Sequence, residues 1–354
     1  MVLQRDVRWD VIPAATMRSA LARKIINERD RQLSSLRDRL ERHQIIIYFV
    51  FVVVAAAVAF LVPHTSALEV AINPALALML FVTFLQVPLA DLGRAFTRIR
   101  FLGALLVTNF MIVPLLVALL VQFLSADPMV MLGVLFVLLT PCIDYVVTFS
   151  HIGRADARLL LAATPALLIT QMLLLPAYLR VFLGDAAAEL VHLGPFLHAF
   201  VWLIAIPLVL AALVQVWAAR SGIGARIAAG LGQLPVPVTA LVLFIVVAAM
   251  VPQLGAAASS AIRVIPLYVA FAVIAPFIGW AVAQVFQLEA TASRAVAFSA
   301  GTRNSLVVLP LALAVPGGIP VLPAIIVTQT MVELISSVIY MRLIPRLGGK
   351  NNVE

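Results

Sequence analysis

Charged residues are scarce in this chain. Asp, Glu, Lys and Arg make up 11% of its 354 residues, whereas 64% are apolar and the mean hydropathy is +1.12. Soluble domains have an apolar content of about 45–50%. The composition therefore excludes an ordinary soluble domain and predicts an integral membrane protein.

Cysteine is almost absent as well. Cys142 is the single cysteine, so an intramolecular disulfide is excluded. The catalytic sets of intramembrane enzymes, such as His-Glu-x-x-His or a pair of aspartates, are also missing. We therefore expect a protein that is not an enzyme and that has no cofactor and no resident metal.

Long apolar runs fill most of the chain. A helix needs about 20 residues to cross the hydrocarbon core, and membrane barrels alternate apolar and polar residues over about ten residues. That alternation is missing, so the sequence predicts an all-α membrane protein. We expect ten spans: 44–63, 67–89, 101–123, 129–152, 159–182, 195–217, 235–254, 264–286, 291–315 and 319–344.

Basic residues indicate the orientation. If the N-terminus is cytoplasmic, 21 of the 24 Lys and Arg residues fall in cytoplasmic segments. Cytoplasmic loops carry the excess of Lys and Arg, so we expect both termini in the cytoplasm and a multi-pass protein of the plasma (inner) membrane. The net charge of +8 then needs no nucleic-acid partner. The expected partners are the lipid bilayer and a small substrate.

An internal repeat is visible in the sequence. "TPALLITQ" at 164–171 is similar to "LPAIIVTQ" at 322–329, and the segment from Thr140 is similar to that from Ser299. The spacings are 158 and 159 residues. Chance similarity between aliphatic segments is the alternative explanation.

The repeat predicts two five-span halves, 44–183 and 184–345. An odd number of spans inverts the second half relative to the first, which is the plan of many secondary transporters. A basic amphipathic extension, 1–43, precedes the first half, and a short tail, 346–354, follows the second. Both are expected in the cytoplasm.

The fourth and ninth spans look broken. Pro141 interrupts one and Gly301 the other, and polar residues surround both. Backbone groups freed at membrane depth must find partners or line a cavity, and such breaks in corresponding positions of two halves point to a transport site. The candidate substrate-binding residues are Cys142, Asp144, Arg303, Asn304 and Ser305.

Two of these candidates are charged. Asp144 and Arg303 are 159 residues apart and so correspond in the repeat. A lone charge at the bilayer centre costs on the order of 2.5–3.5 kcal/mol, and we predict that the two side chains pair where the broken spans cross. Separate contacts of each with water or carbonyls are the alternative.

Other polar side chains inside spans are candidates for coupling or for lining the core. Glu333 is an intramembrane acid, which either carries a proton or satisfies a neighbouring hydroxyl. The repeat-related pairs Thr170 with Gln171 and Thr328 with Gln329 either line the site or bond between helices.

The sequence resembles the bile acid/sodium symporter superfamily, and within it the arsenite-efflux permeases. "LTPCIDYVVTFSHIGRADARLLLAATPALLITQ", "AFSAGTRNSLVVLPLALAVP" and "VTQTMVELISSVIYMRLIP" carry the resemblance, which covers residues 44–345. It implies a panel domain of spans 1, 2, 6 and 7 and a core domain of spans 3–5 and 8–10. Broken spans 4 and 9 would cross in the core.

The resemblance also bears on coupling and substrate. Where sodium symporters of the superfamily have sodium ligands, this chain has Val146 and Val147 in span 4, and Ser299 and Arg303 in span 9. It therefore implies coupling to protons or to the membrane potential, with As(III) or Sb(III) meeting Cys142. Ordinary packing of the cysteine is the alternative for that residue. An organic-anion carrier is the alternative function, and a channel fits less well.

Overall fold

The structure is a computed structural model that describes residues 39–86, 98–124, 127–143, 145–184, 198 and 201–348. Within these ranges all regular secondary structure is helical, apart from one isolated bridge between Pro141 and Arg303. The prediction of an all-α membrane protein is confirmed at this level. The amphipathic extension, 1–43, lies outside the described residues up to position 38.

Six described helices are long and apolar enough to cross a membrane. Two consist of single α-helices or nearly so, and four combine consecutive helical segments. They are Arg39–Leu61; η1 (Thr65–Leu68) with α2 (Glu69–Phe84); α4 (Ile99–Val107), η2 (Thr108–Ile112), α5 (Val113–Leu120) and η3 (Val121–Phe123); α8 (Ala157–Leu183); the part Ala257–Val285 of α14 (Leu254–Val285); and α17 (Val321–Leu343) with η6 (Ile344–Arg346).

The remaining helices are shorter. A bent pair, in which the axes differ by 44°, passes the length and apolarity test only when taken together. The prediction of ten spans and two repeats goes beyond what these helix lengths establish. The shorter helices are α6 (Pro128–Leu138), α7 (Val146–Ile152), η4 (Val201–Ala205) with α11 (Ile206–Arg220), the bent pair α12 (Gly222–Leu231) and α13 (Pro235–Met250), η5 (Val251–Gln253), α15 (Ala290–Gly301) and α16 (Ser305–Leu313).

Two boundaries differ clearly from the expectation. Helix α12 occupies a stretch that the sequence indicated as a loop, and α14 begins at Leu254 rather than near Val264. The start of α14 is rich in alanine, which favours helix. Both differences concern segments where polarity and helix propensity point in different directions.

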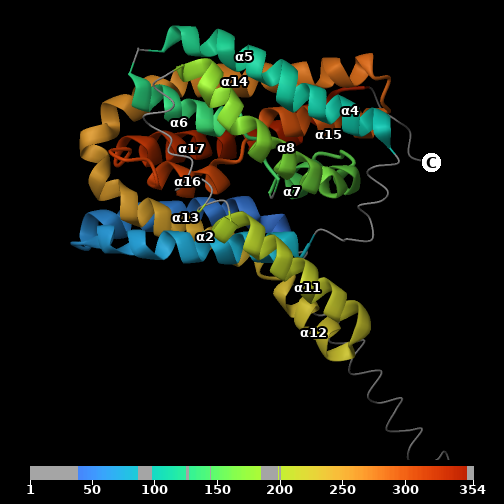
Figure 1. Ribbon diagram of the computed structural model, residues 1–354, viewed down its shortest axis with the longest axis horizontal. Helices are drawn as coiled ribbons and strands as arrows, with labels where there is room; N and C mark the ends of the chain where they lie inside the picture. Colours follow the sequence, from blue (N-terminus) through green and yellow to red (C-terminus); the bar gives the residue numbers. More distant parts are fainter. Residues whose placement is uncertain are drawn as a thin grey trace, which may run out of the picture.

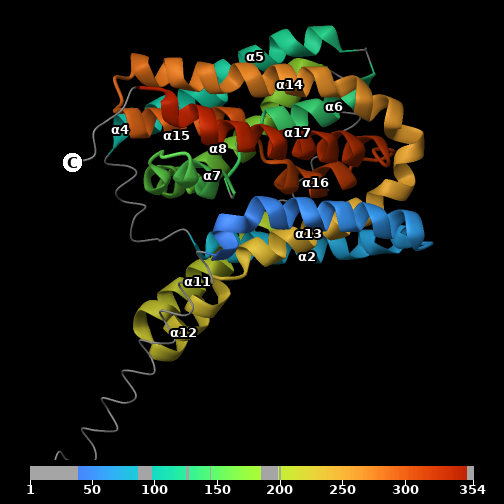
Figure 2. The ribbon, with the colours of Figure 1, turned by 180° about the vertical axis from the view of Figure 1, so that it is seen from behind.

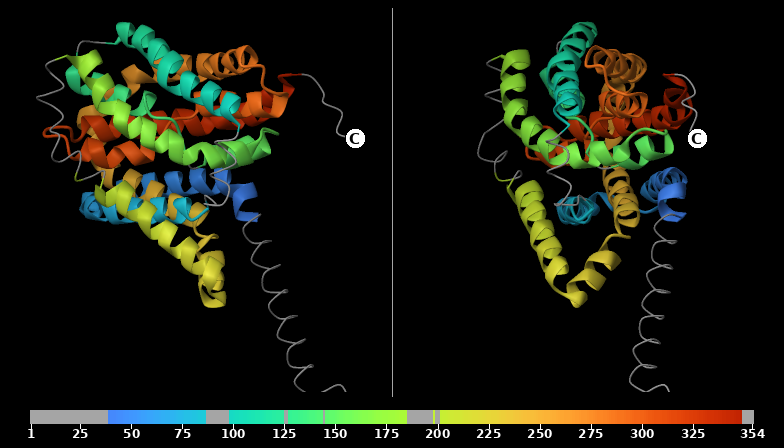
Figure 3. Two further views of the ribbon diagram at one scale, coloured as in Figure 1. Left: turned by 45° about the vertical axis from the view of Figure 1, so that its right-hand side comes forward. Right: turned by 90° about the vertical axis from the view of Figure 1, so that its right-hand side faces the viewer.

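The helices form two layers (Figure 1, Figure 2). One layer holds the Arg39–Leu61 helix, α2 and α13, with α11 and α12 projecting from it, and the other holds α4 to α8 and α14 to α17. The layers stay separate in the turned views of Figure 3. Helix α14 packs against α15 and α17, whereas α16 contacts α2 and α13 contacts α17 between the layers.

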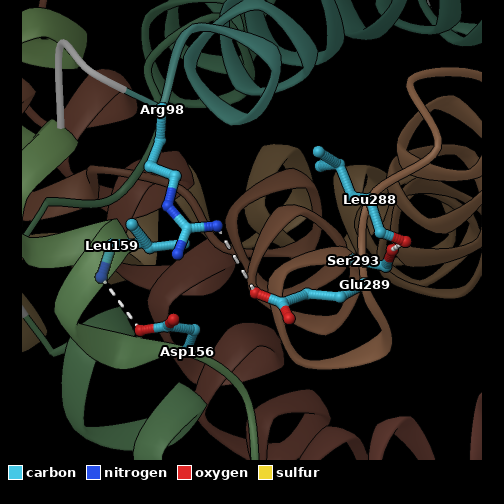
Figure 4. A network of polar contacts seen from close by, with 6 residues as sticks. All are labelled: Arg98, Asp156, Leu159, Leu288, Glu289 and Ser293. Atoms are coloured by element: carbon cyan, nitrogen blue, oxygen red, sulfur yellow. Dashed lines mark hydrogen bonds and ion pairs between the residues drawn. The ribbon is translucent and has the colours of Figure 1, made fainter.

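Helix starts in the second layer are fixed by side-chain caps. The Asp127 carboxylate accepts from the backbone N–H of Met129 at 2.9 Å, and Asp156 accepts from Leu159 at 3.1 Å (Figure 4). Such caps contribute about 1 kcal/mol each. Figure 4 also shows Arg98 facing Glu289 at 3.9 Å, a largely exposed ion pair that adds little stability.

Candidate substrate-binding site

Two interrupted helices meet in the second layer. Helix α6 ends at Leu138 and α7 begins at Val146, whereas α15 ends at Gly301 and α16 begins at Ser305. Both interruptions lie where Pro141 and Gly301 predict them. A broken helix leaves peptide groups without intrahelical partners, and in a membrane these groups must be satisfied inside the protein.

The two breaks satisfy one another. The backbone N–H of Cys142 donates to the Thr302 carbonyl at 3.2 Å, and the N–H of Asn304 donates to the Thr140 carbonyl at 2.8 Å. These bonds make Pro141 and Arg303 partners in an antiparallel bridge. The bridge does not use the N–H group that proline lacks.

The Arg303 side chain is held by oxygen atoms. It is fully buried, and its Nη2 donates to Asn109 Oδ1 at 2.8 Å and to the carbonyls of Ser299 at 2.6 Å and Ala300 at 2.7 Å. Its Nη1 donates to the Leu138 carbonyl at 3.3 Å. A guanidinium surrounded by carbonyl and amide oxygens is solvated much as a bound metal cation would be.

The face of the guanidinium is covered by an aromatic ring. The Arg303 Cζ atom lies 5.4 Å from the centroid of the Phe271 ring, within the range of a cation–π contact. Asp144 lies outside the described residues, so its pairing with Arg303 stays a prediction. The described contacts of Arg303 already stabilise the charge by other means.

Glu333 connects three elements near the breaks. The carboxylate is buried and accepts from the Arg303 backbone N–H at 2.8 Å, from the Tyr145 hydroxyl at 2.8 Å and from Gln329 Nε2 at 2.5 Å. Ser305 donates to the other end of the Gln329 amide. Glu333 therefore ties α17 to the first break through Tyr145 and to the second break through Arg303.

The other candidates are distributed unevenly. Cys142 and Asn304 are buried within the bridge, and the Asn304 side chain caps α16 by accepting from Val307 N–H at 3.4 Å. Thr328 bonds to the Ala324 carbonyl of its own helix at 2.7 Å, and Thr170 is half-buried on α8. Of the two Thr–Gln pairs, Gln329 is thus the member placed in the polar network.

Several hydrogen bonds recur at one spacing along the chain. Tyr178 donates to the Phe110 carbonyl and Tyr340 to the Ala272 carbonyl, each at 2.5 Å. Phe110 lies four residues before Pro114, and Ala272 four before Pro276, so each hydroxyl satisfies a carbonyl that a proline leaves unbonded. Corresponding residues of the two sets are 162 apart.

The same spacing relates the two breaks. Thr140 bonds to the Phe136 carbonyl and Thr302 to that of Phe298, both at 2.8 Å and again 162 residues apart. At this spacing Arg303 corresponds to Pro141, which it faces across the bridge, rather than to Asp144. The expected spacings of 158 and 159 were wrong for these contacts, because aliphatic segments align equally well when shifted by one helical turn.

Gln171 corresponds to Glu333 at this spacing. Its amide is buried, and neither Oε1 nor Nε2 has a hydrogen-bond partner among the described residues. The comparison explains this: Glu333 accepts from the backbone N–H of Arg303, and the corresponding Pro141 has no N–H to give. Asn304 Nδ2 and Arg303 Nε are buried donors that likewise lack partners among the described residues.

Sequence reasoning missed three members of the site, Asn109, Tyr145 and Phe271. Asn109 is an isolated amide in an otherwise apolar span and sits in the π-helical segment η2. Intramembrane polar groups are functional candidates, and π-helical turns are frequent at functional sites, but the sequence shows only the first of these signals. Tyr145 and Phe271 carry none that separates them from ordinary packing residues.

The family comparison agrees with this architecture. No curated protein sequence matches the chain. The model of the sodium bile acid symporter family matches residues 73–256, more than half of the chain, and this stretch includes the first break. Members of the family are transporters rather than enzymes. The chain therefore belongs to the sodium bile acid symporter family, as a multi-pass membrane transporter.

Proposed function

We propose that this transporter exports arsenite or antimonite from the cytoplasm and is driven by protons or the membrane potential rather than by sodium. The observation that carries the proposal is the position of the Arg303 guanidinium. It takes four oxygen acceptors in the crossing of the breaks, where a sodium-coupled relative would bind its ion. A permanent cation in that cradle excludes a second one by repulsion.

The repeat supports a carrier with two inverted halves and ten spans. Residues that correspond at the 162-residue spacing lie far apart unless they sit next to a pseudo-twofold axis. Pro141 and Arg303 correspond and are bridge partners. The axis then passes through the crossing, which is where inverted-repeat transporters bind their substrate.

Cys142 is the group that favours a metalloid. Its side chain is buried in the crossing, and sulfur is the soft ligand that thiophilic As(III) and Sb(III) prefer. The thiol sulfur replaces one hydroxyl of the neutral trihydroxide. That hydroxyl leaves with the thiol proton as water, and the reverse step releases the substrate, so no oxidation or reduction is involved.

Unpartnered polar groups complete the substrate site in this proposal. The Gln171 amide offers a donor and an acceptor, and Asn304 Nδ2 offers a donor. A neutral trihydroxide presents hydroxyl groups that both donate and accept. Buried polar groups without partners cost about 1–3 kcal/mol each, so a substrate that satisfies them gains affinity and selectivity.

Glu333 is the proposed coupling group. Its carboxylate holds both breaks through Tyr145 and Arg303. Protonation converts one acceptor oxygen into a donor, which is incompatible with three incoming donors. Gain or loss of one proton would therefore loosen or tighten the link between the breaks.

The two layers supply the moving parts. The layer of α4 to α8 and α14 to α17 acts as the core domain, and the layer containing α2, α11 and α13 as the panel domain. Alternating access is movement of the core against the panel. With both termini in the cytoplasm of a plasma (inner) membrane protein, outward movement is export.

The alternative is an organic-anion carrier in which Arg303 contacts the anion. The four oxygen acceptors and the Phe271 ring around the guanidinium argue against it, because that charge is already satisfied.

Transport assays separate the two. We expect inside-out vesicles with the native chain to accumulate arsenite and Cys142→Ser vesicles to lose at least nine-tenths of this, with Ser66→Ala as an unrelated control. Inserted native protein that fails to accumulate arsenite, or a Cys142→Ser variant that still does so normally, contradicts the proposal.

A further inference from the structure

A groove runs along the outside of the second layer between α14 and α17. It has a volume of about 400 Å³ and is lined almost entirely by aliphatic and aromatic side chains, from Ile265 to Phe277 on α14 and from Val332 to Leu347 on α17 and η6. The two helices lie side by side in Figure 2. We refer to it as the α14–α17 groove.

The groove opens outward, away from the protein core. Val273 on α14 is 58% exposed, Phe277 is 61% exposed and Ile335 on α17 is 55% exposed. Both helices are long and apolar enough to span a membrane. These side chains therefore face the hydrocarbon of the bilayer rather than water.

The polar atoms of the groove are already satisfied. The Tyr340 hydroxyl donates to the Ala272 carbonyl at 2.5 Å, and the Ser336 hydroxyl donates to the Val332 carbonyl at 2.8 Å. An occupant gains nothing from hydrogen bonds inside the groove. The occupant that fits is therefore a hydrocarbon chain.

One end of the groove is basic. Helices α14 and α17 run in parallel, because Tyr340 bonds to Ala272 and eight residues further on in both helices Gly348 packs against Trp280. Arg342 and Arg346 are exposed at this end. Each follows a groove-lining residue by three positions and so flanks the groove. Tryptophan is typical of the membrane interface, and the arginines place positive charge there.

We propose that the α14–α17 groove binds an acyl chain of an anionic phospholipid, with the phosphate of its head group at Arg342 and Arg346. The stretch from Val332 to Leu347 is about 22 Å long at 1.5 Å per residue. One leaflet of the hydrocarbon core is about 15 Å thick. One lipid of the leaflet at the basic end therefore fills the groove.

The site adjoins the transport machinery. A Cβ atom at Gly301 would lie 2.7 Å from Pro276 and 2.9 Å from Tyr340, and both of these residues line the groove. The lipid thus contacts residues that pack directly on the second break.

Native mass spectrometry of the purified full chain, after exchange into mixed phosphatidylglycerol and phosphatidylcholine, tests this inference. We expect the native protein to retain one phosphatidylglycerol in preference to phosphatidylcholine. Arg342→Gln and Arg346→Gln should each weaken that preference about fivefold, since a basic residue near an anionic membrane surface contributes about 1 kcal/mol. Arg263→Gln, at the opposite end of α14, should leave it unchanged.

Filling the groove provides a second test. Val273→Trp should abolish retention, whereas Ile274→Trp, one residue along and outside the groove lining, should not. Ile335→Trp fills the groove from α17 and serves if Val273→Trp is not monodisperse. Retention of phosphatidylglycerol by both filled variants, equal retention of the two lipids by the native chain, or an equal effect of Arg263→Gln overturns the proposal.

Discussion

Replacement of Arg303 by glutamine should make the stability of the protein depend on sodium. The substitution removes a guanidinium that donates to the carbonyls of Leu138, Ser299 and Ala300 and to the Asn109 amide oxygen. A glutamine amide can donate to two acceptors, so two or more buried oxygens lose their donor. Each costs about 1–3 kcal/mol, which gives a destabilisation of roughly 2–6 kcal/mol.

The oxygens left behind form the kind of cradle that a hard cation prefers. If sodium enters it and is present at 100 times its dissociation constant, binding restores about 2.7 kcal/mol. At about 2 °C per kcal/mol for a large domain, the melting temperature should rise by roughly 5 °C. The Arg303→Gln variant should thus regain much of its lost stability in sodium.

Thermal unfolding in detergent measures this directly. Native protein and Arg303→Gln are compared in sodium chloride and in choline chloride at equal ionic strength, so that screening is the same in both. We expect the native melting temperature to be identical in the two salts and that of the variant to be higher in sodium. A native protein stabilised by sodium, or a variant indifferent to it, refutes the view of Arg303 as a built-in cation.

Three further predictions concern the surroundings of the site. Glu333→Gln should lower proton-driven arsenite accumulation at least tenfold while arsenite exchange at equal pH persists, and loss of exchange as well would contradict a coupling role. Tyr178→Phe and Tyr340→Phe should each lower stability by about 1 kcal/mol in chemical or thermal unfolding, because each exposes a proline-freed carbonyl; unchanged stability would mean that another donor satisfies it. Gly279→Ala should destabilise by about 1–3 kcal/mol, since its Cβ would lie 2.8 Å from the Val296 carbonyl oxygen, whereas Gly230→Ala, with open space around it, should be neutral or stabilising. Equal melting temperatures of these two variants would contradict close packing of α14 on α15.

Much of the fold is accessible from sequence because the membrane imposes a simple rule. Apolar runs long enough to span the bilayer are helices, and Pro141 and Gly301 mark real interruptions. Helix ends are less predictable, as the early start of α14 shows. Alanine-rich segments can extend a span without changing the apolar pattern.

The site is only partly accessible. Intramembrane charge singles out Arg303 and Glu333 correctly, since buried charges are rare and need partners. Their partners are not predictable, because backbone carbonyls such as those of Ser299 and Ala300 have no sequence signature. The repeat spacing was off by one helical turn for the same reason that aliphatic segments resemble one another, and only hydrogen-bond pairs such as Tyr178 and Tyr340 fix it.

The most direct test of the whole account is arsenite transport by the native chain in proteoliposomes under one imposed ion gradient at a time. The account predicts that accumulation follows a proton gradient or membrane potential and is unchanged when choline replaces all sodium. Accumulation that requires a sodium gradient would contradict it, because the cradle around Arg303 would then not have replaced the coupling ion.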